Sequence, residues 1–177
     1  MDNRELPPTG SRHPYTAMQR STLDIIDLHD QPGHLIRRAQ QIAVSVFFNT
    51  LGRDVTPVQY AILKCLENKP GIDQVTLAQE VALDTSSTAS IAVRLETKGW
   101  IVRHLVGRGQ RSLQLTDEGR DTMRRLDTKI PEMQHTLLQG FSEEDRQTFM
   151  RLLQQFADMN NDMSRAPRRS SGGSSDA

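Results

Sequence analysis

Apolar residues recur every three or four positions along most of the chain, and this spacing predicts amphipathic helices. A short helix is expected over 16–29, after an N-terminal arm that contains proline and glycine. In the segment 34–52 the apolar positions share one helical stripe: Leu35, Ala39, Ile42, Ala43, Val46 and Phe47. Gly52 is expected to end that helix, because glycine readily adopts the left-handed conformation that follows helix ends.

Three further helices are predicted before residue 99. Thr56 and Pro57 supply the N-cap and first-turn proline of the first of them. The second is short and covers 75–83, and the third runs from 84 to 98. One of the hydroxyl side chains near its start is expected to cap this third helix.

After these helices the pattern changes to alternation of apolar and polar residues. Segments 100–106 and 111–115 predict two short strands, with Leu113 and Leu115 on one face. The polar turn Gly107-Arg108-Gly109-Gln110-Arg111 joins them. Helices followed by a hairpin in this order predict a winged helix-turn-helix.

Two more helices are predicted after the hairpin. The first begins at the Thr116 cap and passes through Pro131, which is expected to kink it. The last opens at Ser142 with a variant capping box. Its apolar stripe is Phe149, Leu152, Leu153, Phe156, Met159 and Met163.

Composition narrows the class of protein. The 177 residues include 22 basic and 22 acidic side chains, so only local charge can indicate a polyanionic partner. No apolar run approaches the about 20 residues that cross a bilayer, and no secretory signal is evident. The single cysteine, Cys65, cannot form an internal disulfide and is expected to pack in the core. A cytoplasmic protein with no membrane partner is predicted.

Hydroxyl side chains occupy five of the six positions from 85 to 90. Ser and Thr compete for backbone hydrogen bonds, so helix stability alone does not favour this composition. On a helical wheel Ser86 and Ser90 lie opposite Leu95, on the side away from the core. Short hydroxyl groups allow close approach and can bond phosphates or base edges. An N-cap cluster is the alternative explanation.

The next segment, 98–111, carries cations and no Asp or Glu. A turn with glycines on both sides of an arginine can approach the DNA backbone closely and place the arginine in the minor groove. A solvated turn is the alternative. Together the helix and hairpin predict a DNA-binding surface. Its residues are Thr85, Ser86, Ser87, Ser90, Arg94, Lys98, Arg108 and Arg111.

Four motifs in this order resemble the MarR family of dimeric winged-helix repressors. They are Thr56-Pro57-x-Gln59-Tyr60-x-Ile62-Leu63, the run from Leu77 to Asp84, Leu95-Glu96-x-Lys98-Gly99-Trp100-Ile101 and Leu115-Thr116-Asp117-Glu118-Gly119. The resemblance implies that 85–98 is the recognition helix and 107–111 the wing. The wing lacks the acidic residue usual in the family, so the choice between Arg108 and Arg111 for the groove stays open, with Arg108 favoured.

The resemblance also implies a homodimer formed by the terminal helices, which would bind a roughly palindromic operator. The apolar residues expected in that interface are Met123, Leu126, Ile130, Phe149, Phe156 and Met159. The predicted fold class is mostly α with a small β-hairpin wing, a winged helix-turn-helix domain plus a helical dimerisation region. The predicted parts are an arm (1–31), a first core helix (32–55), the DNA-binding domain (56–116), dimerisation helices (117–163) and a disordered tail (164–177).

Members of the family often leave DNA when a small aromatic acid binds. The segments GHLIRRAQQIAVSVFF and TPVQYAIL look most similar to the branch that controls nicotinate degradation, which implies an effector such as 6-hydroxynicotinate. A carboxylate needs a cation and a ring needs an amphipathic wall. The candidates are His34, Arg38, Gln59 and Tyr60, each of which also has an ordinary structural explanation.

No motif predicts catalysis, a metal or a cofactor. The histidines at 13, 29, 34, 104 and 135 lack metal-ligand spacing, and the wing lacks the lysine of a phosphate-binding loop. We therefore predict a ligand-responsive repressor and not an enzyme. A winged-helix protein-interaction module, or a DNA-binding regulator without a ligand, is the alternative.

Overall fold

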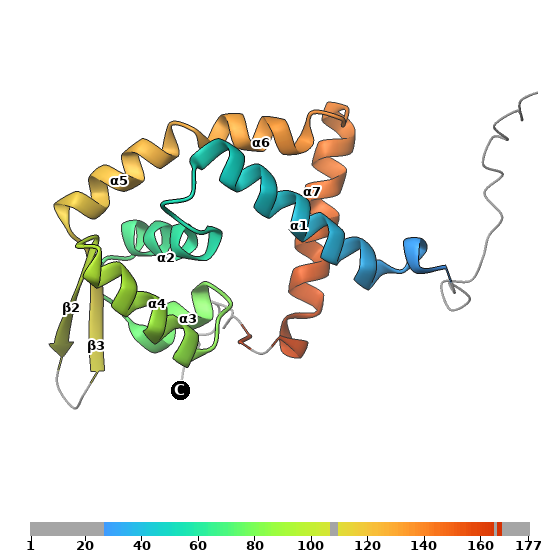
Figure 1. Ribbon diagram of the computed structural model, residues 1–177. Coiled ribbons are helices and arrows are strands. Elements are labelled where there is room, and N and C mark those ends of the chain that lie inside the picture. The colour runs from blue at the N-terminus through green and yellow to red at the C-terminus, as the bar shows by residue number, and fades with distance from the viewer. Residues whose placement is uncertain (1–26, 107–109, 165, 168–177) are drawn as a thin grey trace, which may run out of the picture. The chain divides into compact units, whose positions relative to one another are not determined.

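The computed structural model describes residues 27–106, 110–164 and 166–167 (Figure 1). The chain divides into two compact units between Ala39 and Gln40. In the first unit a 3-10 turn, η2 (Leu28–Asp30), precedes the start of helix α1 (Pro32–Leu51). Most of the helix predicted over 16–29 falls outside the described residues.

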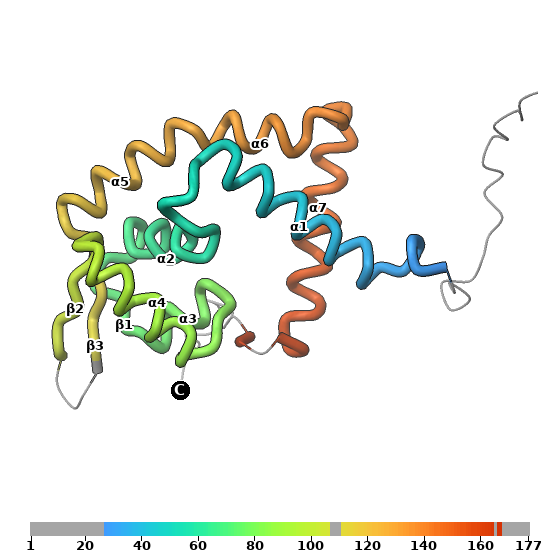
Figure 2. The backbone as a smooth tube through the Cα atoms, viewed as in Figure 1, coloured from blue at the N-terminus to red at the C-terminus, as the bar shows by residue number. Residues whose placement is uncertain are grey.

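The second unit contains the remainder of α1 and all later elements (Figure 2). In chain order they are α2 (Pro57–Asn68), β1 (Ile72–Asp73), α3 (Gln74–Glu80), α4 (Thr85–Thr97), β2 (Ile101–Val106), β3 (Gln110–Leu115), α5 (Asp117–Asp127), α6 (Ile130–Leu138), α7 (Glu143–Met159) and the 3-10 turn η3 (Asn161–Met163). This order confirms the predicted mostly α fold with a β-hairpin wing.

The wing is an antiparallel sheet with the strand order β1-β3-β2. Strands β2 and β3 pair from Ile101 opposite Leu115 to Val106 opposite Gln110, as the hairpin prediction required. Strand β1 adds Ile72 opposite Leu113. The sequence pattern did not indicate β1, because two residues are too few to show an alternation.

The core of the second unit lies among α2, α3, α4, α5 and the sheet. Its fully buried large side chains include Ile62, Leu63, Leu66, Leu77, Leu95, Ile101, Leu113 and Met123. Burial of each such aliphatic side chain contributes about 1.5–3 kcal/mol. Cys65 packs against this cluster, in agreement with its predicted place. The core therefore holds α4 and the wing on one body.

A close backbone approach joins α5 to Trp100, which lies three residues after the end of α4. A Cβ atom on Gly119 would collide with the carbonyl oxygen of Trp100, so only glycine fits this position without a shift. The Trp100 amide donates to the Leu95 carbonyl at 3.0 Å, and the Trp100 carbonyl accepts from the Thr116 amide at 3.1 Å. Trp100 is thereby fixed to the end of α4 and to the start of α5.

The predicted long helix after Thr116 is wrong, because the chain forms two helices there rather than one kinked helix. Helix α5 ends at Asp127 and α6 begins at Ile130. Pro131 has no amide hydrogen, and its ring would clash with the carbonyl of Asp127 four residues earlier in a continuous helix. Ser142 caps α7 as predicted, since its hydroxyl accepts from the Asp145 amide at 3.1 Å.

Candidate nucleic-acid interface

Helix α4 buries one face and exposes the other, as the helical wheel predicted. Thr88, Ala92 and Leu95 are buried. The buried Thr88 hydroxyl donates to the Asp84 carbonyl at 3.0 Å, so it is satisfied within the helix. The exposed positions are Thr85, Ser86, Ser90, Val93, Arg94 and Thr97. Helix α4 packs on α3 and on β2, and it therefore lies beside the wing (Figure 1).

The cap of α4 is Asp84, so the expectation that a hydroxyl side chain caps this helix is wrong. The Asp84 carboxylate accepts from the Ser87 amide at 2.8 Å. It also accepts from the hydroxyl groups of Ser86 and Ser87, at 2.6 and 2.7 Å. These hydroxyl donors, with the amide, hold the pKa of Asp84 well below its usual 3.8. Ser86 and Ser87 therefore take part in the N-terminal cap of α4 through their bonds to Asp84. Ser90 lies one turn further along the exposed side of the helix.

Among the wing cations, Arg103 has a structural partner. Its Nε donates to the Glu96 carboxylate at 2.8 Å, its second guanidinium nitrogen contacts the same oxygen, and its side chain is only 12% exposed. The bond from Arg103 lowers the pKa of Glu96. Because Glu96 is on α4 and Arg103 on β2, this pair ties the wing to the helix.

Arg111 differs from Arg103 in its surroundings. Arg111 lies on β3, is exposed and forms no ion pair within the described ranges. Its charge contributes to the lowered pKa of Glu96. Arg108, which was favoured for the minor groove, lies outside the described residues. Arg111 is therefore an exposed cation in the described part of the wing, and its contact with DNA stays a prediction.

Lys98 points toward the loop between α1 and α2. Its ammonium group donates to the Asp54 carbonyl and lies 4.3 Å from the centre of the Trp100 ring. A cation over an indole face is stabilised by the ring quadrupole. A phosphate contact by Lys98 would have to replace these partners, and its DNA role stays a prediction.

A hollow of about 460 Å³ opens between the start of α3, the exposed face of α4 and the wing. Its lining includes Val75, Ala89, Val93 and Arg111. Exposed Val75 and Val93 are suited to contact with thymine methyl groups in a major groove. Neither was among the predicted site residues. A valine on the polar side of a helical wheel is the signal that could have identified Val93.

Two of the predicted effector residues, Gln59 and Tyr60, have partners in the fold. The Gln59 side chain accepts from the Thr56 amide at 3.1 Å and completes the capping box of α2. The Tyr60 hydroxyl donates to the Asp127 carboxylate at 3.2 Å. Desolvation and the charge of Asp127 raise the pKa of Tyr60. Their part in ligand binding stays a prediction.

The other two predicted effector residues, His34 and Arg38, lie in the part of α1 that belongs to the first unit. The Nε2 atom of His34 is buried, with no hydrogen-bond partner in the described part of the chain. Burial, and then the charges of Arg37, His29 and Arg38, lower the pKa of His34. The side chain of Arg38 is exposed.

The six predicted dimer residues divide into two groups. Met123 and Leu126 are buried in the core of the chain itself, so their apolar surface is already covered and their predicted place in an interface is wrong. Ile130 is partly buried against the same core. On α7, Phe149 is 37% exposed, Phe156 is 48% exposed and Met159 is 74% exposed. Among the six residues, those exposed on α7 therefore remain as the candidate interface.

Comparison with known proteins identifies the family. Residues 55–104 match the model of the MarR family. The chain is 34% identical to the PcaV transcriptional regulator from Streptomyces coelicolor, solved in complex with its natural ligand, with a TM-score of 0.71. That similarity covers 75% of this chain and 96% of PcaV. The chain belongs to the MarR family.

Two further proteins qualify the nicotinate assignment within the MarR family. The homoprotocatechuate degradative operon repressor of Escherichia coli is 28% identical over 137 residues, which are 76% of this chain and 93% of the repressor. BpsR of Bordetella bronchiseptica, whose DNA binding is regulated by 6-hydroxynicotinic acid, is 22% identical, with a TM-score of 0.70 and coverage of 75% of this chain and 97% of BpsR. At that identity BpsR shows the fold alone.

As a MarR-family member the chain is a transcriptional regulator rather than an enzyme. Within the described residues no group of three or more His, Cys, Asp or Glu side chains is arranged to hold a metal. No helix in those same ranges combines the length and apolar character that a membrane span requires.

Proposed function

We propose that this MarR-type regulator is a dimeric repressor that binds a roughly palindromic operator and leaves it when a small aromatic acid binds. One observation carries the DNA part of this proposal. The exposed face of α4 presents Ser90 and Arg94, and exposed Arg111 lies on the adjoining wing. Hydroxyl and guanidinium donors on one surface match the phosphates and base edges of a duplex.

The local charge of this surface outweighs the neutrality of the whole chain. Phosphate contacts dominate affinity for DNA, so a few uncompensated cations suffice if they lie on the binding face. Glu96, an acid of α4 beside the wing, is paired with Arg103, and Asp73 of β1 is engaged in capping α3. Arg94 and Arg111 then give the face a positive potential, which attracts a polyanion.

A dimer is supported by the apolar surface of α7. Phe149, Phe156 and Met159 are exposed on one helix, and exposed apolar groups of this size usually mark an interface. Two-fold symmetry would place two α4 helices about 34 Å apart, one turn of DNA. The expected operator therefore has two inverted half-sites at that spacing.

The proposed effector is an aromatic acid because of what the relatives respond to or control. Homoprotocatechuate, named in the repressor of Escherichia coli, is itself an aromatic acid. PcaV was solved with its natural ligand. Within this class, 6-hydroxynicotinate is the narrower candidate, from the resemblance of α1 and α2 to the nicotinate branch.

The test begins with selection of bound duplexes from fragmented genomic DNA by the full-length protein, followed by footprinting. We expect protection of two inverted half-sites and repression of a reporter placed downstream. Aromatic acids, including homoprotocatechuate and 6-hydroxynicotinate, are then titrated into the complex up to about millimolar concentration. Binding without sequence preference would contradict the proposed operator, and a complex that no acid dissociates would contradict the proposed effector.

A further inference from the structure

The hollow of about 460 Å³ between α3, α4 and the wing has an apolar part in its wall. Val75 comes from the start of α3, and Ala89 and Val93 come from neighbouring turns of α4. Val75 is 54% exposed and Val93 is 46% exposed, so the core covers neither side chain. Single exposed valines are common on protein surfaces, but apolar side chains from two helices that line one hollow form a patch.

Helix stability does not account for Val93. A valine loses side-chain freedom in a helix, because its branched carbon is crowded by the preceding turn. Ala92 and Leu95 already supply the buried side of α4. On the exposed side an unbranched polar residue such as lysine or glutamine is the better helix former. Val93 on this side therefore indicates a contact that forms with a partner.

The charges around the hollow indicate that the partner is a polyanion. Arg111 lines the hollow from the wing and is exposed, and Arg94 follows on the exposed face of α4. The other two charged residues of the lining are engaged within the fold. Arg103 is paired with a carboxylate of α4, and Asp73 caps α3. The available charge at the apolar patch is thus positive, which matches the backbone of a duplex.

We propose that Val93, together with Val75, reads the C5-methyl group of a thymine in each half-site of the operator, an inference that rests on the proposed function. That methyl is the apolar group which marks thymine in the major groove of unmodified DNA. Ser90 and Arg94 lie on the same exposed face of α4, and their donors pair with acceptor atoms that several bases present. The valines add a selection for thymine that these donors cannot make.

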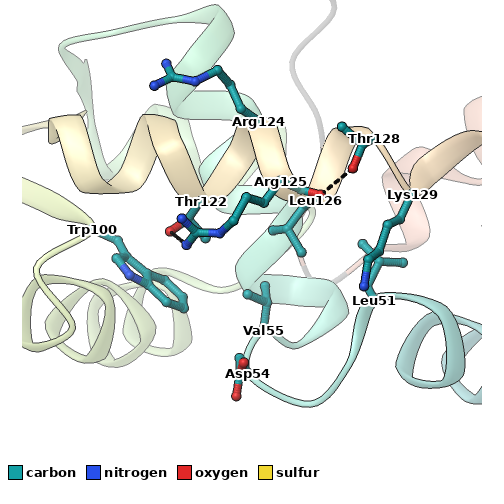
Figure 3. A pocket seen from close by; sticks show the side chains of 10 residues that line it. All are labelled: Leu51, Asp54, Val55, Trp100, Thr122, Arg124, Arg125, Leu126, Thr128 and Lys129. Carbon is teal, nitrogen blue, oxygen red and sulfur yellow. Dashed lines mark hydrogen bonds between the residues drawn. The ribbon is translucent and has the colours of Figure 1, made fainter.

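The fold holds Val93 at a fixed depth, as a contact with one methyl group requires. Carbon atoms attract one another best at about 3.5–4.0 Å, so a small displacement weakens the contact. Leu95, two residues further along α4, is buried, and its carbonyl accepts from the Trp100 amide at 3.0 Å. Trp100 in turn lines one cavity with Thr122 and Arg125 of α5 (Figure 3). Val93 is therefore positioned by a helix that is anchored in the core.

Replacement of thymine by deoxyuridine tests the proposal directly. An operator selected with the full-length protein is rebuilt with one deoxyuridine at a time, which removes the methyl group and keeps the other major-groove atoms. We expect one position in each half-site at which this change weakens binding roughly fourfold, the value for burial of one methyl group. Both changes together should weaken binding roughly fifteenfold, the product of the two. Fluorescence anisotropy at constant salt measures each duplex.

Variants then assign the methyl group to the valines. In Val93→Ala the deoxyuridine penalty should fall from roughly fourfold to less than about twofold, because the apolar contact is already lost. Val93→Thr keeps the shape of the side chain but adds a hydroxyl group, and Val75→Ala trims the second valine, so each should lower the penalty in part. Val58→Ala, which trims an exposed valine on α2, is the matched control and should keep the full penalty. Circular dichroism establishes that each variant is folded.

A methylated cytosine separates the methyl group from the rest of the base pair. Replacing the identified T·A pair by C·G removes the methyl group and also changes the hydrogen-bonding edge. The base 5-methylcytosine returns a methyl group to the same place in the major groove. It should bind roughly fourfold more tightly than cytosine there with the unaltered protein, and less than about twofold more tightly with Val93→Ala.

The outcomes separate this inference from the proposed function. If the protein selects an operator and no deoxyuridine weakens binding, the inference is wrong and the proposed function is unaffected. The same holds if the penalty is equal in the unaltered protein and in Val93→Ala, because another group then contacts the methyl. If the protein selects no DNA sequence at all, the proposed function is wrong and the inference fails with it.

Discussion

Helices α4 and α7 each carry an apolar face, but the two faces have different surroundings. Helix α4 buries Leu95 and its neighbours in the core of the chain that carries them. Helix α7 has no buried residue, and large apolar side chains such as Phe156 remain exposed along it. The spacing of apolar residues therefore predicts that one face of a helix will be buried. It does not predict whether the same chain or a second chain covers that face. The difference indicates that the winged domain completes its own core, whereas the apolar face of α7 is left uncovered, as the proposed dimer requires.

The largest expected effect comes from placing a charge on the α7 surface. Phe156→Glu should convert the proposed dimer to a monomer in sedimentation experiments. Operator affinity should then fall by roughly 10²–10⁴-fold, because the two linked recognition helices no longer bind as one unit. Gln155→Glu, which adds the same charge at a neighbouring exposed polar position, is the control. If the Phe156→Glu variant is still a dimer, α7 does not form the proposed interface.

The next effect tests whether α4 is held by its own chain. Leu95→Ala should lower the free energy of unfolding by roughly 2–5 kcal/mol, because it leaves a cavity in a fully buried position. Val93→Ala, on the exposed face of the same helix, should change it by about 0.5 kcal/mol or less. Urea denaturation at two protein concentrations measures both. Equal losses for the two variants would show that Val93 is also covered.

A smaller effect distinguishes the two described arginines of the wing. Arg111→Ala should reduce the slope of log affinity against log salt by about 0.9, the value for one phosphate contact. Arg103→Ala should reduce that slope less, because Arg103 is engaged with Glu96, and it should instead lower stability. Fluorescence anisotropy with a labelled operator over a range of salt concentrations gives both slopes. An unchanged slope for Arg111→Ala would remove the wing from the DNA interface.

The smallest effect concerns the cap of α4 and depends on pH. The folded-state pKa of Asp84 lies below its usual 3.8, so its ionised form stabilises the fold above that value. This contribution is lost as the pH falls below 3.8 toward the folded-state pKa. Asp84→Asn should therefore melt at a lower temperature than the unaltered protein near pH 7, and the gap should narrow below pH 3.8. A gap that widens on acidification would contradict the assigned cap.

The sequence was sufficient for features that depend on local periodicity. The spacing of Thr88, Ala92 and Leu95 determines which side of α4 turns inward, and the alternation around Leu113 determines the face of β3. The start of α7 was predictable because Ser142 forms its cap within one turn. These features involve neighbours along the chain, so pattern alone identifies them.

Other features depend on contacts between distant positions. Lys98 meets Asp54, and Arg125 meets the cavity beside Trp100, only after folding. Met123 occupies an apolar position of the kind that a dimer interface would also show. The pattern does not reveal that the core of the same chain buries this side chain. The cap of α4 was missed for a different reason. Asp and Ser are about equally good caps, so adjacent candidates at 84–86 could not be ranked.

The Arg103–Glu96 pair has a consequence for the geometry of the proposed complex. It joins β2 to α4 through an arginine side chain that is only 12% exposed, and so it holds the described strands of the hairpin beside the helix. The distance between the groove that receives the helix and the groove that receives the hairpin is then set by the protein. A duplex must adopt that separation of its grooves when it binds. DNA sequences that deform to it at low elastic cost are therefore bound more tightly, even at base pairs that no side chain contacts.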